Sequence, residues 1–371
     1  MKIVHVCKKY PKALGGDAVV VSNLRKQQEA AGHEVVIVTS NCPEIVSGNR
    51  LYKYGLKDTP HGLDSITARR LFSLLALCFR MYTILHRERP DVIHTHSVDM
   101  AFCVALAARF FRIPIIHTFH IVTFYDNSQS IIRRKIEIWL AKKINARIIT
   151  APNNFDVERL QQAGLKCATL LSNGVDVNFW ERDHASRNTE KKKFTFVSAG
   201  RLERQKGYSY LIEAVALLAK TAGRPFNVIV AGEGTQMTML SARARALGLE
   251  NIVQFVGSKD VHSIRELLHN ADAAVFPSLY ETTPLTLLEA WAAGVPVVMT
   301  ATGILRDITP KSEAAYVVPV KNSEELMAAM RRCMQDAEER QKIADNGRAE
   351  VQQYAWPIIA RSAENLYRRA V

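Results

Sequence analysis

Short apolar runs rich in Val and Ile alternate with longer amphipathic stretches from one end of the chain to the other. Continuous apolar runs are typical of strands buried on both faces of a sheet, and amphipathic stretches are typical of helices that cover it. In the first half, strands are predicted near 2–7, 34–39, 91–95, 114–119, 146–150 and 168–171, and helices at 17–31, 64–89 and 129–144. This alternation predicts a doubly wound α/β domain.

The polar segment 181–193 (ERDHASRNTEKKK) interrupts the alternation and is predicted to be an interdomain linker. After it, strands are predicted near 194–199, 226–231, 252–256, 272–276, 295–299 and 314–317, and helices near 207–222, 235–247, 260–270, 285–293 and 323–335. The remainder, 336–371, is helical in pattern, with a break before Pro357. The chain is therefore predicted to contain two Rossmann-like domains, at 1–180 and 194–352.

Composition agrees with a folded protein in the cytoplasm. Of 371 residues 48% are hydrophobic and 23% are charged, as in globular proteins. No secretory signal precedes the first predicted strand, and Leu71–Phe79, one of the longest apolar stretches, has about half of the roughly twenty residues that span a bilayer. The six cysteines are scattered without a CxxC pair, which favours neither a disulfide framework nor a zinc site.

Ligands of open parallel sheets bind beyond the carboxyl ends of the strands, so binding and catalytic residues are expected in the loops there. Gly15 and Gly16 follow the first strand and precede a helix, where glycine lets the backbone approach an anion. A tight turn explains the same pair. No GxGxxG follows any strand, which disfavours a dinucleotide-dependent dehydrogenase.

Arg201 and Lys206 lie in the segment GRLERQKG directly after the first strand of the second domain. Two cations flanked by glycines at a helix start can clamp a diphosphate and neutralise the charge of a leaving group. The alternative is a solvated basic turn.

Two glutamates, Glu281 and Glu289, lie in the segment 277–296 (PSLYETTPLTLLEAWAAGVP) after another strand. Pro284 is predicted to begin a helix, whose free amides near Thr283 and Leu285 would favour a phosphate or a sugar hydroxyl. Carboxylates can accept hydrogen bonds from sugar hydroxyls. The alternative is that both glutamates are surface acids.

His120 follows the predicted strand 114–119 and is a candidate catalytic residue, with a structural role as the alternative. His94 and His96, in PDVIHTHS, and His117 are interpreted as structural histidines.

Together these motifs resemble those of the retaining GT-B glycosyltransferases of family 4. The resemblance runs over nearly the whole chain and rests on GG at 15–16, AGHEV at 31–35, PDVIHTHS at 90–97, SNGVD at 172–176, GRLERQKG at 200–207, GEG at 232–234, FVG at 255–257 and the Glu281-x7-Glu289 segment. It implies two Rossmann-like domains facing a cleft, an acceptor-binding first domain, a nucleotide-sugar-binding second domain, and a helix at 353–371 that packs back on the first.

The resemblance also implies roles for single residues. The Gly16 backbone would bind the donor phosphate, His120 would lie near the donor sugar, and Arg201 and Lys206 would bind the diphosphate. Glu281 would hold hydroxyls of the donor sugar and Glu289 the ribose, with the base near 255–262. The implied reaction is transfer of a sugar, with retention, from a UDP- or GDP-linked donor to an acceptor hydroxyl. No metal cofactor is expected, since no DxD pair follows a strand.

Two alternatives remain at this point: a GT-B sugar-nucleotide epimerase, and a basic membrane-surface protein without catalysis. A phosphorylase is disfavoured, because it would bring a pyridoxal-phosphate lysine and a much longer chain.

Charge is concentrated in the first half of the chain. Residues 1–180 contain 24 basic and 14 acidic residues, against 25 and 22 in residues 181–371. No aromatic interleaving or nucleic-acid motif accompanies this excess, so a lipid-linked or cell-surface glycan acceptor at an anionic membrane is predicted instead.

In 131–143, helical spacing places Ile132, Ile136, Trp139 and Lys143 on one face, which suits a helix at a membrane surface. The alternative is that this face packs on the sheet.

Overall fold

The structure is a computed structural model that describes residues 1–10, 16–41, 51–53, 68–122, 131–182 and 193–371. The chain divides into two compact units, and each is described by itself. Unit 1 contains Met1–Asn173 and Trp356–Val371, and unit 2 contains Gly174–Ala355. The chain enters unit 2 before the polar segment 181–193, because Trp180 is buried in the core of unit 2. Residues 183–192 of that segment lie outside the described residues.

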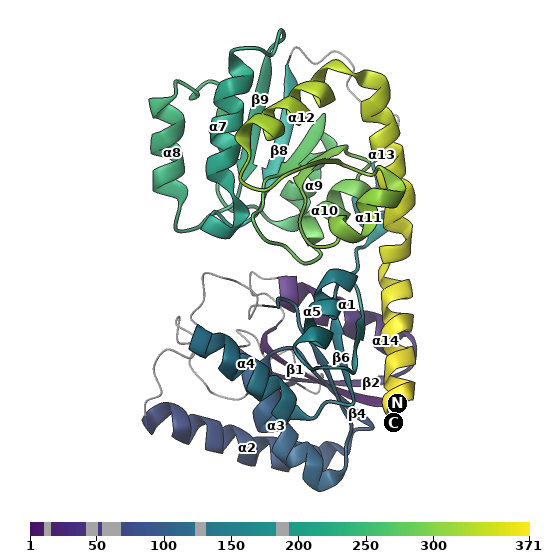
Figure 1. Ribbon diagram of the computed structural model, residues 1–371. Helices are drawn as coiled ribbons and strands as arrows, with labels where there is room; N and C mark the ends of the chain where they lie inside the picture. The colour runs from purple at the N-terminus through teal and green to yellow at the C-terminus, as the bar shows by residue number, and fades with distance from the viewer. Residues whose placement is uncertain (11–15, 42–50, 54–67, 123–130, 183–192) are drawn as a thin grey trace. The chain divides into compact units, whose positions relative to one another are not determined.

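Unit 1 is built on one parallel sheet with the strand order β3-β2-β1-β4-β5-β6-β7 (Figure 1). Its elements are β1 (Lys2–Lys9), α1 (Gly16–Ala30), β2 (Glu34–Asn41), β3 (Leu51–Lys53), α2 (Ala68–Glu88), β4 (Val92–Thr95), α3 (Val98–Phe111), β5 (Ile115–Thr118), α4 (Ile131–Ile144), β6 (Ile148–Ala151), α5 (Asn154–Gln162), β7 (Ala168–Leu170) and α14 (Trp356–Ala370).

Alternate residues of the unit 1 strands enter two different cores, as strand geometry requires. Val4 and Val6 of β1 pack with α2 and α3, whereas Ile3 packs with α1 and α14. Trp356 and Tyr367 of α14 are buried in this second core. Burial of each large apolar side chain contributes roughly 1.5–3 kcal/mol, so α14 is an integral part of unit 1.

Unit 2 is built on a second parallel sheet with the order β10-β9-β8-β11-β12-β13. Its elements are α6 (Val177–Trp180), β8 (Phe194–Ala199), the 3-10 helix η3 (Arg204–Lys206), α7 (Tyr208–Ala219), β9 (Phe226–Ala231), α8 (Met237–Ala246), β10 (Val253–Phe255), α9 (Val261–His269), β11 (Ala273–Phe276), α10 (Leu285–Ala292), β12 (Val297–Thr300), α11 (Leu305–Ser312), β13 (Tyr316–Val318), α12 (Ser323–Gln335), α13 (Ala337–Val351) and the 3-10 helix η4 (Gln352–Tyr354).

The unit 2 sheet is also covered on both faces. Phe196 of β8 packs with α7 and α12, whereas Val197 packs with α10 and its fully buried Trp291. Both sheets are therefore Rossmann-like and doubly wound, as predicted from the alternating pattern.

Each predicted strand has a counterpart in the structure, and so does each predicted helix. The break expected before Pro357 lies at η4, between α13 and α14. The edge strand β3 and the helices α3, α5, α6 and α11 were not among the predicted elements. All of them except the 14-residue α3 are nine residues long or shorter, which is too short for a periodic pattern to be distinctive.

The strand order of each sheet reverses direction once, which places its candidate binding edge. In unit 1 the reversal lies between β1 and β4, and in unit 2 between β8 and β11. At such a switch point the loops that follow the two central strands diverge, leaving a crevice beyond their carboxyl ends.

Candidate functional site

In unit 2, the loops after β8 and β11 are joined backbone to backbone. The Leu279 amide donates to the carbonyl of Gln205 over 2.8 Å, and the Gln205 side chain donates to the carbonyl of Tyr280 over 2.9 Å. Between them, Gly207 has a φ of 66°, and a Cβ there would lie 2.0 Å from the Pro277 carbonyl oxygen. Only glycine fits this close approach, so the loops hold each other rigidly.

Lys206 and Glu281 form an ion pair across these two loops. The same carboxylate oxygen, Oε1, accepts a 2.9 Å hydrogen bond from the Ser278 hydroxyl. Only 20% of the Lys206 side chain and 11% of the Glu281 side chain are exposed. Glu281 Oε2 and two of the three ammonium hydrogens of Lys206 remain for a ligand.

Arg201 lies on the same edge with a fixed backbone and an exposed side chain. Its neighbours Gly200 and Leu202 donate to the carbonyls of Ala231 and Glu233 over 2.9 and 2.8 Å. Among the described residues, the Arg201 guanidinium makes no hydrogen bond or ion pair, so it can meet an anion without first breaking a contact.

The predicted helix start at Pro284 is confirmed, since α10 begins at Leu285 with Pro284 as its N-cap. Thr283 is 1% exposed and Pro284 is also buried. Within the described part of the chain, the amides of Leu285 and Thr286 donate to no acceptor. Free first-turn amides carry the positive end of the helix dipole and favour an anion or a hydroxyl oxygen.

Glu289 lies one turn further along α10 and is only partly exposed. Its carboxylate makes no hydrogen bond or ion pair with any described residue, and burial raises its pKa to about 7. An unsatisfied carboxyl group of this kind is a ready acceptor for hydroxyl groups.

A small cavity in unit 2 gathers several of these groups. Its lining includes Lys206, Glu281, Pro284, Thr286 and the buried Tyr208, whose pKa burial raises to about 12. Four predicted site residues, Lys206, Glu281, Pro284 and Leu285, are therefore close neighbours on one edge of the unit 2 sheet.

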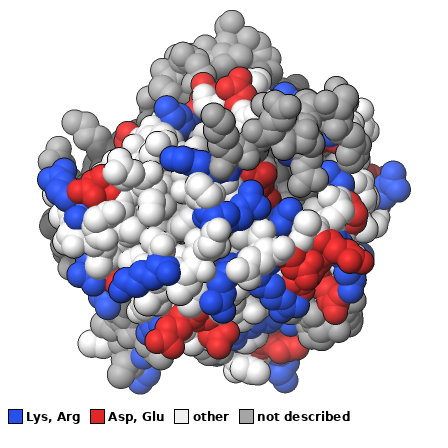
Figure 2. Space-filling view, turned by 90° about the horizontal axis from the view of Figure 1, so that it is seen from above, with Lys and Arg blue, Asp and Glu red and all other residues white. Residues whose placement is uncertain are grey.

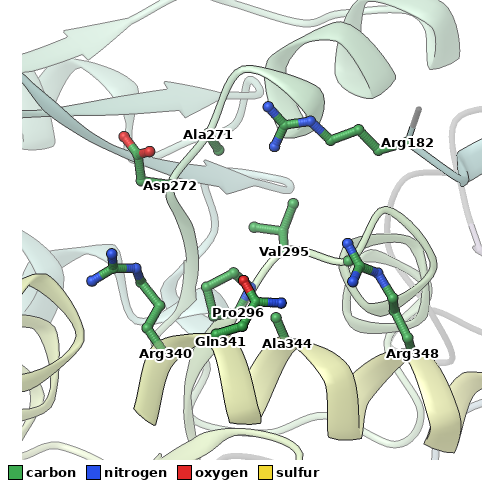
Figure 3. A pocket seen from close by; sticks show the side chains of 10 residues that line it. Arg182, Ala271, Asp272, Val295, Pro296, Arg340, Gln341, Ala344 and Arg348 are labelled. Atoms are coloured by element: carbon green, nitrogen blue, oxygen red, sulfur yellow. The ribbon is translucent and has the colours of Figure 1, made fainter. Parts of the chain in front are cut away.

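A second and larger hollow of unit 2 lies at the opposite edge of the sheet, beside Asp272 and Pro296 at the starts of β11 and β12 (Figure 3). Arginines line it, but Arg340 donates to the carbonyl of Cys333 over 2.7 Å and Arg348 pairs with Asp345 over 3.0 Å. These arginines have structural partners, so the edge with Lys206 and Glu281 is the stronger candidate.

The unit 1 candidates follow β1 and β5. Gly16 is the exposed first residue of α1, and Gly15 lies outside the described residues. His120 is half-buried beyond the end of β5, and the negative charge of Asp17, in the first turn of α1, acts on it. The helix start and His120 are thus neighbours in unit 1.

His94, His96 and His117 are buried, in keeping with their interpretation as structural histidines. His5, His94 and His96 are close enough for a metal ion by distance alone. Their ring nitrogens are already engaged, however: His5 with His96 and Gln28, and His94 with Tyr367 and Thr118. A metal would have to displace these hydrogen bonds, so the group is described as a hydrogen-bonded cluster.

Some residues of the candidate sites had no signal in the sequence. Ser278 supports Glu281 and Gln205 joins the two loops, but an isolated serine or glutamine after a strand is common. His5 lies inside a predicted strand, so only the pairing of β1 with β4, which places His5 opposite His94, shows its partners.

Comparison with known proteins gives matches over nearly the whole chain. The family model described as Glycosyl transferases group 1 matches residues 180–350, and the model described as Glycosyltransferase Family 4 matches residues 14–179. Glycogen synthase of Mycobacterium tuberculosis is 29% identical, covering 99% of this chain and 94% of that protein.

Solved structures share the fold. Sucrose-phosphate synthase from Thermosynechococcus elongatus superposes with a TM-score of 0.83 at 22% identity, covering 99% of this chain and 98% of the other. HepE from Anabaena, solved in complex with UDP-glucose, has a TM-score of 0.80 at 19% identity and covers 99% of both chains.

Proposed function

Because the chain belongs to glycosyltransferase family 4 and has the GT-B fold, we propose that it is a retaining hexosyltransferase. The donor is a UDP- or GDP-linked sugar, and the acceptor is a hydroxyl of a lipid-linked or cell-surface glycan in polysaccharide biosynthesis. The observation that carries this proposal is the Lys206–Glu281 pair beside the free amides of α10, with Arg201 on the same edge.

The cations of unit 2 bind the diphosphate of the donor. Arg201, Lys206 and the first-turn amides of α10 offer donors to phosphate oxygens, and negative charge grows on these oxygens as the glycosidic bond breaks. Interactions that strengthen in this way accelerate the reaction. We infer that these groups supply the charge stabilisation, so no metal is required.

The carboxylates hold the neutral parts of the donor. Glu281 Oε2 accepts hydroxyls of the sugar, while its Oε1 keeps Lys206 in position. Glu289 accepts the ribose hydroxyls. UDP-glucose bound to HepE, which shares the fold, supports a nucleotide-sugar donor of this kind.

The anomeric configuration is retained because the acceptor hydroxyl attacks the same face of the sugar that the diphosphate leaves. In this front-face displacement the acceptor oxygen bonds to the anomeric carbon as the bond to the diphosphate oxygen breaks. A departing phosphate oxygen takes the hydroxyl proton. For unit 1, we propose that the Gly16 backbone binds a donor phosphate and that His120 lies near the donor sugar.

A membrane surface is the proposed location of the acceptor. Within the described residues, no helix is long and apolar enough to span a bilayer. The alternative that the apolar face of α4 packs on the sheet is not what the structure has, since Ile132 is 72% and Trp139 is 53% exposed. Exposed Lys135, Lys142 and Lys143 lie on the same helix. An apolar face with cations suits an anionic membrane surface.

No nucleic-acid partner is proposed. On the face shown in Figure 2, Lys and Arg lie among Asp, Glu and uncharged residues, without a continuous basic surface.

The test of the donor site is a panel of UDP- and GDP-sugars, measured first by the rise in melting temperature and then by transfer and hydrolysis. Lys206→Ala, Glu281→Gln and Arg201→Ala are each expected to lower kcat/KM by about a hundredfold or more, as when one donor to a developing anion is lost. Arg204→Ala is the matched control, because Arg204 is exposed in the same turn. Wild-type activity in Lys206→Ala or Glu281→Gln would refute the site, and an epimerised donor without acceptor would refute transfer.

Binding of the protein to a membrane surface is tested separately by sedimentation with anionic vesicles at low salt. The wild type should bind, and both Trp139→Ala with Ile132→Ser and the triple change of Lys135, Lys142 and Lys143 to Glu should bind less. Ile358→Ser, which alters an exposed apolar residue of α14, is the control. Equal binding of all variants, or none by the wild type, would favour an acceptor in solution.

A further inference from the structure

A row of hydrogen-bonded rings runs through unit 1 to the candidate residue His120. His5 Nε2 lies 2.8 Å from Gln28 Oε1, and His5 Nδ1 lies 2.9 Å from His96 Nε2. His96 Nδ1 then lies 3.0 Å from His120 Nε2. His5, Gln28 and His96 are buried, and the row ends at half-buried His120. The interior of the unit is thus connected to its candidate binding edge.

Tyr367 of α14 holds the inner end of the row. The Gln28 amide donates from Nε2 to the Tyr367 hydroxyl over 2.9 Å. That hydroxyl lies 2.8 Å from His94 Nδ1, and His94 Nε2 lies 2.6 Å from the Thr118 hydroxyl. Turning the Gln28 amide over would therefore reverse the hydrogen bonds of this second branch as well, so the Gln28 amide sets the direction of both branches together.

The orientation of Gln28 determines the protonated nitrogen of each ring in the row. Its Oε1 can only accept, so His5 donates from Nε2, and a neutral imidazole has no second N–H. His5 Nδ1 must then accept from His96 Nε2. By the same rule His96 Nδ1 accepts from His120 Nε2, and Nδ1 of His120 is left unprotonated.

The rings of the row stay neutral at ordinary pH. Burial lowers the pKa of His5 to about 4, and the charge of Arg25 acts in the same direction. Burial also holds the pKa of His96 well below its usual value, helped by the neighbouring His94 and His120. Burial lowers the pKa of His120, although the charge of Asp17 opposes this effect.

We propose that Gln28, His5 and His96 are positioning residues that fix His120 as the tautomer with a protonated Nε2 and an unprotonated Nδ1. His120 then offers a hydrogen-bond acceptor, rather than a donor, to a hydroxyl of the bound sugar. The part played by this hydroxyl rests on the proposed glycosyltransferase function, whereas the tautomer itself does not. Tyr367 contributes by holding the Gln28 amide.

The tautomer is measured directly on the full chain labelled with [15N]histidine, using long-range 1H–15N correlation spectra at pH 7. His120→Asn identifies the His120 signals. In the wild type, His120 should show a protonated Nε2 and an unprotonated Nδ1. Gln28→Leu removes the acceptor and should give a mixture of tautomers, whereas Gln28→Glu, whose ionised carboxylate can only accept, should retain the wild-type form. Tyr367→Phe is a milder second variant in case Gln28→Leu does not fold.

A wild-type His120 protonated at Nδ1, or a tautomer that Gln28→Leu and Tyr367→Phe leave unchanged, would overturn the proposal. Stoichiometric zinc bound by the purified chain and lost on His5→Asn would also overturn it, because the cluster would then be a metal site.

Kinetic measurements test whether the tautomer of His120 affects sugar transfer. Loss of one hydrogen bond to the sugar should lower kcat in Gln28→Leu about tenfold, with unchanged affinity for the free nucleotide, and Gln28→Glu should restore it. Gln27→Leu, on the same helix but outside the row, is the matched control. Unchanged kcat despite an altered tautomer would overturn the positioning role. A wild type with the expected tautomer but no transfer of any sugar would instead refute the proposed function.

Discussion

Lowering the pH should destabilise unit 1 more than unit 2, because the core of unit 1 contains neutral histidines that become protonated when the chain unfolds. The pKa of His5 is lowered to about 4, mainly by burial, from 6.5 in an exposed chain. As the pH falls from 6.5 to 4, His5 therefore binds a proton in the unfolded state but stays neutral in the folded state. Each pKa unit corresponds to 1.36 kcal/mol, so His5 alone costs about 3 kcal/mol of unfolding free energy.

Other groups around His5 act in the same direction. Burial lowers the pKa values of His94, His96 and His120 as well, so the loss of stability is at least that of His5. The free energy of unfolding of a domain is only about 5–15 kcal/mol, so unit 1 loses a large share of its stability.

Hydrogen exchange followed by mass spectrometry measures this loss in each unit separately. After correction for intrinsic rates, peptides from β1 and β4 should lose about a hundredfold protection between pH 6.5 and 4. Peptides from β8 and β11 are the internal reference, because the two described histidines of unit 2, His262 and His269, are not buried. Equal protection of β1 and β4 at both pH values would refute the reasoning.

Three further predictions concern unit 2. Because burial raises the pKa of Glu289 to about 7, nucleotide affinity measured by calorimetry should rise about tenfold from pH 6 to pH 8, and Glu289→Gln should abolish this rise. Gly303→Ala should destabilise unit 2 by about 2 kcal/mol in denaturant titrations, since Gly303 has a φ of 51° and a Cβ would lie 1.8 Å from the Thr282 carbonyl oxygen; an unchanged midpoint would contradict this. Transfer should persist in excess EDTA, and a strict need for Mg²⁺ or Mn²⁺ would contradict charge stabilisation by Arg201 and Lys206.

The sequence by itself determined the two sheets and the family. Strands buried on both faces of a parallel sheet are typically near-continuous apolar runs, and β2 and β11 stand out for this reason. The sequence also determined which loops follow strands, so Lys206 and Glu281 could be named as site residues. Their proximity required only that the loops after two central strands lie at one edge of the sheet.

Tertiary structure alone decided how these residues are held. The Ser278 hydroxyl on Glu281 and the direction of the Gln28–His5–His96 row depend on contacts between distant parts of the chain. So does the burial of α14 against β1, which brings Tyr367 to Gln28. Periodicity tells only that a side chain faces the core, whereas the partner that it meets there is fixed by strand order, register and helix packing.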